Sequence, residues 1–503
     1  MRNYQALVMA LVALPAVIVA CGDGDDDAPA DTGGGGGSSG SATGGKGGGS
    51  GKGGTSGEGG TQGGGSGGTR GGSGGASGMG GEPPGGAGGE ETGGTSGTGG
   101  NTGCDLSGDG KPHDAIPADI DSDLTLTSDT VWDLSGFTKV HDGAVLTIEP
   151  CTRIEGSPAP SPGVLAVLRG GQIDAAGTAN EPILFTSASS PGARAAGQWG
   201  GVVLLGNAPI TAASTSKVFE GLTDTDFTYG GADDADDSGT MQYVRIEFAG
   251  WNILPDKEIN GLSMAAVGSG TTLDHIMVSN IRDDCFEWWG GSVDADYLIC
   301  NNPGDDMFDS DEGYVAAGNY WFGRRTGVTV ISSTDPSGFE WDGTEGGADL
   351  SPKPRTHVTA SNVTLCGTGA AVSMGGGAPE FGMVLRELIE GEIDGAAVLG
   401  FEYGLDTRNQ FMTGDVTIDN SIFWSLANAV GAPDSTDNDM GFVDATIVTG
   451  GTNNETMPTP VPFTLADCQH EGGPSDAVKE SDVGAFAGDA TWMEGLWVDF
   501  SAN

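Results

Sequence analysis

The sequence has few basic residues. Only 20 Lys and Arg stand against 70 Asp and Glu, which gives a formal net charge of −50. Nucleic-acid binding draws its affinity from Lys and Arg that neutralise phosphates, and docking on anionic lipid uses basic patches. The composition therefore argues against both classes of partner. It favours cations or neutral, bulky ligands.

Metal-binding and helical patterns are also scarce. The five histidines are dispersed and no cysteine pair has CxxC spacing, so a transition-metal site is not expected. Helical periodicity is nearly absent. Only Phe381 to Gly391 could form a short helix, and its Gly and Ile content disfavours one.

The first 20 residues predict a secretory signal peptide. Met1-Arg2-Asn3 is a short basic start, and Ala6 to Val19 is an apolar run of the length of an h-region. The end of this run and Cys21 resemble the bacterial lipobox. The resemblance implies an exported outer-membrane lipoprotein, displayed at the cell surface and held only by lipid on Cys21. The alternative is an ordinary signal peptide followed by a stray cysteine.

Residues 21–103 predict a disordered linker. They are almost entirely Gly, Ser, Thr and Ala, with scattered charges, and such a composition cannot bury a core that offsets the entropy of ordering it. A Gly-rich chain of this length has an end-to-end distance of about 50 Å. The folded domain is therefore expected over residues 104–503, as a monomer held away from the membrane.

Six cysteines follow Cys21, and an even number in an exported protein predicts up to three disulfides. Cys285 and Cys300 are a plausible local pair because they are close in sequence. The remaining four have no spacing that settles their partners, and fifteen connectivities are open. Two pairings are suggested for them: Cys104 with Cys151, and Cys366 with Cys468.

Internal repeats predict the fold. The segments 283–291, 305–313 and 336–344 align, and the first two are 22 residues apart. Short apolar runs between Gly, Asn and Asp residues indicate strands. Repeats of this length predict an all-β parallel β-helix whose coils stack about 4.8 Å apart. A β-sandwich and a β-propeller fit the spacing less well.

The alignment also predicts which side chains share a column. Phe286, Phe308 and Phe339 fall in one column, and the acidic residue that follows each of them falls in the next. Because side chains alternate along a strand, we expect the Phe column inside the coils and the acidic column outside. A second ladder starts at His275, Tyr297, Asn362 and Asn420, and a fainter repeat pairs residues 382–386 with 404–408.

Several segments resemble bacterial exported proteins of the pectin-lyase-like, right-handed parallel β-helix group. They include Trp199 to Pro209, Tyr243 to Gly250, Asp305 to Tyr314 and Trp492 to Trp497. The resemblance extends from about Leu124 to the end of the chain. It implies an architecture and an exported location, and it does not imply a reaction.

Acidic residues gather on successive coils of the predicted β-helix. Stacked carboxylates repel one another, and Ca²⁺ relieves such repulsion by taking about 6 to 8 oxygen ligands in irregular geometry. We therefore predict a Ca²⁺ site, and the alternative is a solvated acidic stripe. The candidate ligands are Glu287, Asp305, Asp306, Asp309, Asp311 and Glu340.

A catalytic interpretation starts from the same region. Asp283-Asp284-Cys285 resembles the Asp-Asp-Cys of polygalacturonases, whose paired carboxylates act on a glycosidic bond. The Gly-His-Gly of that family is absent here, which weakens the resemblance. A polysaccharide lyase would need a cationic base, and Arg324, Arg325, Arg386 and Arg408 are the candidates. The alternative is that these arginines form salt bridges with the surrounding acids.

Aromatic residues accompany the acidic column. Strand alternation places Trp288 and Trp341 inside with the Phe column, and it places Trp289 and Asp342 outside, as candidate ligand-binding residues. The combined hypothesis is a surface lipoprotein that binds Ca²⁺ and a glycan or another extracellular polymer, for adhesion or capture. The alternatives are a polysaccharide-active enzyme and a structural spacer.

Overall fold

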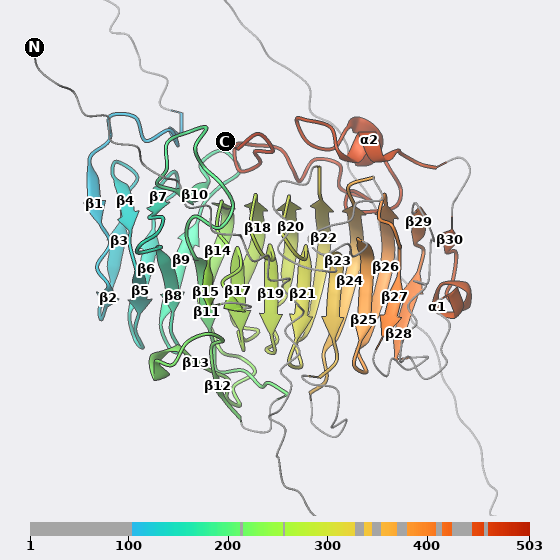
Figure 1. The fold of residues 1–503 in the computed structure, drawn as a ribbon, viewed down its shortest axis with the longest axis horizontal. Helices are drawn as coiled ribbons and strands as arrows, with labels where there is room; N and C mark the ends of the chain where they lie inside the picture. Colours follow the sequence, from blue (N-terminus) through green and yellow to red (C-terminus); the bar gives the residue numbers. More distant parts are fainter. Residues whose placement is uncertain are drawn as a thin grey trace, which may run out of the picture. The chain divides into compact units, whose positions relative to one another are not determined.

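The computed structural model describes residues 103–211, 215–254, 257–326, 336–344, 354–369, 380–408, 415–424, 445–456 and 461–502. The predicted signal peptide, Cys21 and nearly all of the predicted linker lie outside these residues. The described part is a stack of parallel strands, shown in Figure 1 from β1 in blue to β30 in orange. It is the predicted parallel β-helix.

Two parallel sheets form the wall of the β-helix. The larger sheet has 16 strands among the described residues. Its main path is β1 (His113–Ala115), β4 (Val131–Leu134), β7 (Arg153–Gly156), β10 (Ile183–Ser187), β14 (Gly239–Glu247), β18 (Thr272–Ser279), β20 (Ala295–Asn301), β22 (Val315–Arg324), β24 (His357–Cys366), β26 (Glu390–Leu399), β29 (Ile422–Trp424) and β30 (Glu455–Thr456). Four strands lie off this path: β3 (Leu124–Leu126), β6 (Val145–Ile148), β9 (Gln172–Ala176) and β28 (Val416–Asp419).

The smaller sheet has 10 strands in the described part of the chain. In order they are β2 (Asp119–Ile120), β5 (Phe137–Val140), β8 (Val164–Val167), β11 (Gly201–Leu205), β17 (Leu262–Ala265), β19 (Phe286–Trp289), β21 (Phe308–Asp311), β23 (Ser337–Asp342), β25 (Phe381–Arg386) and β27 (Asp406–Arg408). Residues 384–386 pair with 406–408 in the register that the repeat of 382–386 and 404–408 predicted. The segment from Phe381, where the composition disfavoured a short helix, begins with strand β25, next to the last strand of this sheet.

Long strands of the larger sheet bend from one face of the coil to the next. β14 pairs with β9 through its first half and with β10 through its second half. The bend falls at Tyr243, whose φ is 51°, and the matching residues His275, Tyr297 and Tyr320 have φ between 51° and 60°. This left-handed conformation is uncommon for non-glycine residues. Their rings stack outside the coil at centroid distances of 4.3 to 4.8 Å, which stabilises the repeated bend.

Aromatic rings pack against one another in the interior of the β-helix, along strands β19, β21 and β23. Phe286, Phe308 and Phe339 occupy matching positions on adjacent strands, with centroids 5.5 and 5.9 Å apart. Trp288 and Trp341 lie among them and are at most 1% exposed. The predicted interior column is therefore confirmed.

Two covers pack on the outside of the wall. The first consists of two hairpins, β12–β13 (Lys217–Val218 and Thr228–Tyr229) before β14 and β15–β16 (Asn252–Leu254 and Lys257–Glu258) after it, with the 3-10 helix η1 (Thr225–Phe227) inside the first hairpin. We call these two hairpins together the excursion, and it packs on the smaller sheet. The C-terminal strap, residues 461–502, contains α2 (Leu465–Cys468) and α3 (Asp476–Lys479) and packs on the larger sheet. In Figure 1 the strap is the red segment.

The strap is an apolar cover. Its Phe486, Trp492 and Trp497 share one buried cluster with Met277 and Phe322 of the larger sheet. The helix α1 (Ala445–Gly450) buries Ile447 and Val448 in the main core. Within the described residues no helix has the length and apolar character needed to cross a bilayer.

Three disulfides link the six cysteines that follow Cys21. Cys285 bonds Cys300 across one coil, and Cys104 bonds Cys151 near the first strands. Cys366 bonds Cys468 and ties the strap to strand β24. All three suggested pairings are confirmed.

Candidate functional site

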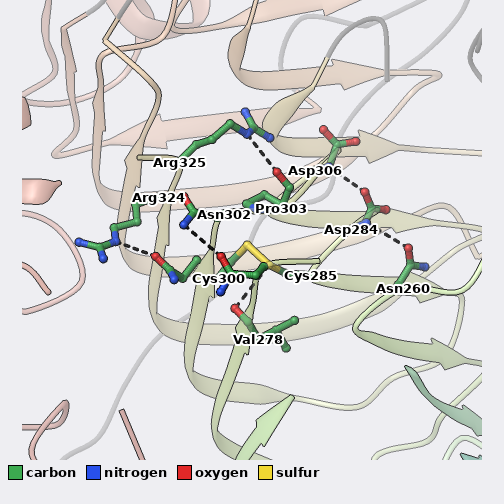
Figure 2. Close-up of a disulfide and its surroundings, with 12 residues drawn as sticks. Asn260, Val278, Asp284, Cys285, Cys300, Asn302, Pro303, Asp306, Arg324 and Arg325 are labelled. Atoms are coloured by element: carbon green, nitrogen blue, oxygen red, sulfur yellow. Dashed lines mark hydrogen bonds between the residues drawn. A yellow bond between two sulfur atoms is a disulfide. The ribbon is translucent and has the colours of Figure 1, made fainter. Parts of the chain in front are cut away.

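A ladder of polar side chains lines one corner of the coils, just before β17, β19, β21 and β23. Asn260 Oδ1 accepts a hydrogen bond from the Asp284 N–H at 3.2 Å, and Asp284 Oδ1 accepts one from the Asp306 N–H at 2.7 Å (Figure 2). Asp306 Oδ1 accepts hydrogen bonds from the Ser337 N–H and from the Ser337 hydroxyl, the second at 2.6 Å. Each side chain therefore satisfies a backbone donor of the next coil, as buried donors require.

The predicted acidic column follows the ladder along the same strands. Glu287, Asp309 and Glu340 are register partners on β19, β21 and β23, and all three are half-buried. Glu340 forms an ion pair with Arg386 at 2.8 Å. Glu287 accepts a hydrogen bond from the side-chain amide of Asn260. The column exists, and Arg386 lies at its Glu340 end.

Carboxylates crowd where the corner ladder meets the acidic column. Asp284, Glu287 and Asp309 place ligand oxygens within 4.8 Å of one another. Asp283, Asp284 and Asp305 form a second such set, and the two sets share Asp284. We call these five residues the acidic cluster. Their oxygens are the ligand type that hard cations prefer.

The electrostatics of the acidic cluster favour a bound proton or cation. Burial, followed by the charge of Asp306, raises the pKa of Asp284 well above its ordinary value. Burial, followed by the charge of Asp309, does the same to the pKa of Glu287. The pKa of Asp309 is also raised by burial and by neighbouring carboxylates, although Arg386 and a hydrogen bond with Glu287 oppose the shift. Desolvation and like charge are the two physical causes.

Three residues that were not predicted from the sequence complete this environment. Asn260 belongs to the corner ladder, and Glu220 and Glu258 come from the excursion. Burial, then the charges of Glu258 and Glu220, raise the pKa of Asp283. The excursion falls between repeats, so the 22-residue spacing could not align it.

Three predicted calcium ligands lie outside both sets. Asp306 caps Ser337 in the corner ladder, and Glu340 pairs with Arg386. Asp311, at the far end of β21, caps the Glu312 N–H. Burial, followed by the charge of Asp342, raises the pKa of Asp311. The described ligand sets therefore keep Glu287, Asp305 and Asp309, and they add Asp283 and Asp284.

Two of the four arginines considered as catalytic bases, Arg324 and Arg325, are buried and engaged. Arg324 is 2% exposed, donates to Asn301 Oδ1 at 2.8 Å, and lies 4.1 Å from the ring centroid of Phe500. Burial lowers the pKa of Arg324 to about 10. Arg325 pairs with Glu380. Neither guanidinium is presented to the acidic cluster as a base, which agrees with the salt-bridging alternative for Arg325.

The predicted ligand-binding residues on the outer face are covered. Trp289 is 8% exposed and packs edge-on against Phe219 of the excursion, with centroids 5.0 Å apart. Asp342 pairs with Arg386. The outward direction of both side chains was predicted correctly. The expectation of an exposed Trp289 ring is wrong, because the excursion packs over that face of the sheet.

A third set of metal-compatible groups lies near the first strands and was not expected. His113 Nδ1 is 2.9 Å from Asp133, and Glu155 completes the set. The hydrogen bond to Asp133 raises the pKa of His113. Arg153 lies 2.7 Å from Glu155 and neutralises it, so this set is an exposed ion-pair network.

The comparisons with known proteins identify the fold and leave the ligand open. The family model of the pectate-lyase like beta helix domain matches residues 118–497. No curated protein and no solved structure matches the chain. The match runs from just before β2 into the strap, so it includes the acidic cluster.

Proposed function

This chain belongs to the pectate-lyase-like β-helix family, and we propose that its β-helix binds Ca²⁺ at the acidic cluster. The proposal rests on one observation. Two sets of carboxylates share Asp284 and lie within ligand distance of one another, in a place where burial disfavours their charge.

The donor set selects the kind of ion. Five carboxylates offer oxygen alone, and Ca²⁺ takes about 6 to 8 oxygens at about 2.4 Å in irregular geometry. Thiolate and imidazole ligands, which suit zinc and copper, do not occur in the two described sets. The carbonyl and amide oxygens of the corner turns are further donors of the same class.

The second part of the proposal concerns location and partner. The N-terminal features support an exported lipoprotein, attached through Cys21 and displayed from the outer membrane on residues 21–103. There the β-helix contacts a glycan or another extracellular polymer. Trp288, Trp289 and Trp341 are buried, so the proposed contact uses bound Ca²⁺ and polar groups in place of aromatic stacking. A chain with net charge −50 needs such a cation to approach an anionic polymer.

Melting of the purified full chain tests the proposal. The melting temperature is measured after EDTA treatment and then across a Ca²⁺ titration, with Mg²⁺ at equal concentration as the control ion. A saturable rise with Ca²⁺ is expected, because a ligand that binds only the folded state stabilises it by mass action. No rise at millimolar Ca²⁺ would remove the metal proposal. Glycan arrays with Ca²⁺, and with EDTA as the control, then test the polymer.

A further inference from the structure

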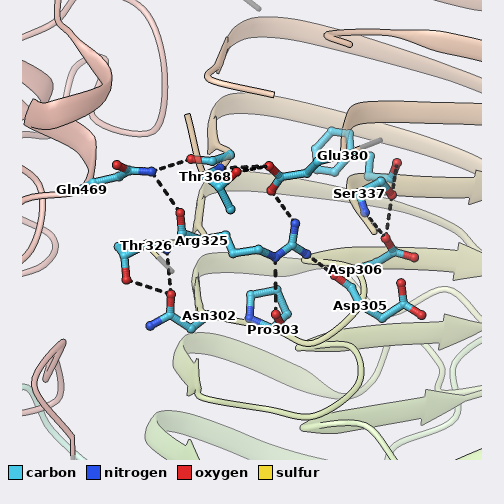
Figure 3. A network of polar contacts seen from close by, with 12 residues as sticks. Asn302, Pro303, Asp305, Asp306, Arg325, Thr326, Ser337, Thr368, Glu380 and Gln469 are labelled. Carbon is cyan, nitrogen blue, oxygen red and sulfur yellow. Dashed lines mark hydrogen bonds and ion pairs between the residues drawn. The ribbon is translucent and has the colours of Figure 1, made fainter. Parts of the chain in front are cut away.

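Two consecutive arginines at the end of β22 connect different parts of the fold. Arg324 belongs to the outer side, where it donates to the carbonyls of Cys468 and His470 in the strap. Arg325 donates instead to groups around the turn between β20 and β21 (Figure 3). The alternation of side chains explains why neighbours in sequence contact opposite sides of the wall.

Arg325 forms a fully buried ion pair. Its Nη1 lies 2.5 Å from Glu380 Oε1, and both side chains are 1% exposed. The other oxygen, Oε2, accepts hydrogen bonds from the N–H and the hydroxyl of Thr368 at 2.9 and 2.8 Å. A buried ion pair is tolerated when further hydrogen bonds satisfy both partners, and here they do.

The remaining donors of Arg325 hold the turn that carries the acidic residues. Nε donates to the Pro303 carbonyl at 3.4 Å, and Nη2 donates to the Asp305 carbonyl. Asp305 belongs to the acidic cluster, and Asp306 follows it in the corner ladder. The planar guanidinium therefore fixes one carboxylate and two carbonyls in a single plane, which a lysine cannot do.

The strap contacts the backbone next to the Arg325–Glu380 ion pair. Gln469 donates from Nε2 to the Arg325 carbonyl at 3.0 Å and to the Gly367 carbonyl at 2.5 Å. Gln469 follows Cys468, whose disulfide holds the strap on β24. The strap therefore holds the backbone at Arg325 and at Gly367, the residue before Thr368.

We propose that Arg325 and Glu380 are positioning residues for the cation site, which they serve by holding the Asp305–Asp306 turn. The inference rests on the proposed Ca²⁺ site. Neither side chain needs to touch the ion. Groups that orient the ligands of a metal typically change its affinity by about 10 to 100-fold when they are altered.

Arg325→Lys tests this inference in the full chain. The variant keeps the positive charge beside Glu380 and loses the hydrogen bonds to the Pro303 and Asp305 carbonyls. Arg153→Lys is the matched control, because Arg153 is also buried and also bonds one carboxylate, Glu155, and one carbonyl, that of Leu106. Calorimetric titration with Ca²⁺ should show the Kd of Arg325→Lys rising at least about tenfold. The Kd of Arg153→Lys should stay at the wild-type value.

Equal Kd values for wild type and Arg325→Lys would overturn the inference. If Arg325→Lys does not fold, Thr368→Val replaces it, since that change removes a hydroxyl donor to Glu380 and keeps the ion pair. A smaller rise of the Kd is then expected, and an unchanged Kd again counts against the inference.

Amide hydrogen exchange separates this inference from the proposed function. The amides of Asp306 and Ser337 donate into the corner ladder. In EDTA they should exchange faster in Arg325→Lys than in wild type and be unchanged in Arg153→Lys. A wild type that binds no Ca²⁺ refutes the proposed function. Unchanged exchange in Arg325→Lys refutes the positioning role, whether or not calcium binds.

Discussion

Asp309→Asn should have opposite effects on stability without and with calcium. Asp309 lies between Glu287 and Glu340 in register, and it belongs to a set whose ligand atoms lie within 4.8 Å. Two ionised carboxylates 4.8 Å apart repel by about 3.5 kcal/mol at an effective dielectric constant of 20. Protonation limits this cost, because the pKa of Asp309 is already raised. Removing the charge should therefore stabilise the calcium-free protein at neutral pH.

With calcium bound, wild type should be more stable than Asp309→Asn. At a concentration 100 times its Kd, a ligand stabilises the folded state by about 2.7 kcal/mol. For a domain of about 400 residues this corresponds to a rise of about 3 °C in melting temperature, from the usual unfolding entropy per residue. Wild type should show this rise. Asp309→Asn should show little of it, because one ligand of the ion is lost.

The assay is a melting curve of each full chain, recorded in EDTA and in saturating Ca²⁺. Asp342→Asn is the control, because Asp342 lies on the neighbouring strand and is paired with Arg386. Its loss leaves a half-buried arginine without one partner, so this variant should melt lower in both conditions. If Asp309→Asn instead melts lower than wild type by the same amount in EDTA and in Ca²⁺, the acidic column is structural and the electrostatic reasoning fails.

Two other measurements test the raised pKa values of the acidic cluster and the contribution of the strap disulfide. In EDTA, the melting temperature should fall as pH rises from about 4.5 to neutrality. The unfolded carboxylates lose their protons near pH 4, while Asp284, Glu287 and Asp309 in the folded state keep theirs to higher pH, so the free energy of unfolding decreases through this window. A melting temperature that rises with pH would contradict the raised pKa values. Replacing both Cys366 and Cys468 by Ser should lower the free energy of unfolding by about 4.7 kcal/mol, from the loop-entropy relation for a separation of 102 residues. Replacing both Cys285 and Cys300, whose separation is 15 residues, should lower it by about 3 kcal/mol. Denaturant titrations of the two double variants give this order, and the reverse order would show that the strap disulfide constrains the unfolded chain little.

The columns of the β-helix were predictable because one spacing fixes many neighbours. Once Phe286 and Phe308 are aligned, every residue of β19 and β21 has its partner, including Glu287 with Asp309. Strand alternation then assigns inside and outside, and Trp288 and Trp341 follow. These predictions needed no knowledge of the loops.

The excursion over Trp289 and the Arg325–Glu380 ion pair were not predictable, because the residues that form them lie outside the repeat spacing. Trp289 points outward as expected, yet its exposure depends on Phe219, which lies in an excursion without repeat spacing. Glu380 reaches Arg325 across 55 residues, and no pattern in the sequence links them. A residue whose partner lies in a loop of irregular length carries no periodic signal.

The acidic residues of this region fall into two groups: those that stabilise the fold and those whose placement destabilises it. Asp306 is explained by the fold itself, because its carboxylate satisfies the backbone donor of the next coil, and Glu340 is explained by its ion pair with Arg386. Glu287 accepts a hydrogen bond from Asn260, yet placing it beside Asp309 in a buried site raises the free energy of the folded state when both are charged. A fold seldom keeps a local cost without a gain elsewhere. Cation binding is the gain that this arrangement of oxygens supports, and it predicts that the cost appears only when calcium is removed.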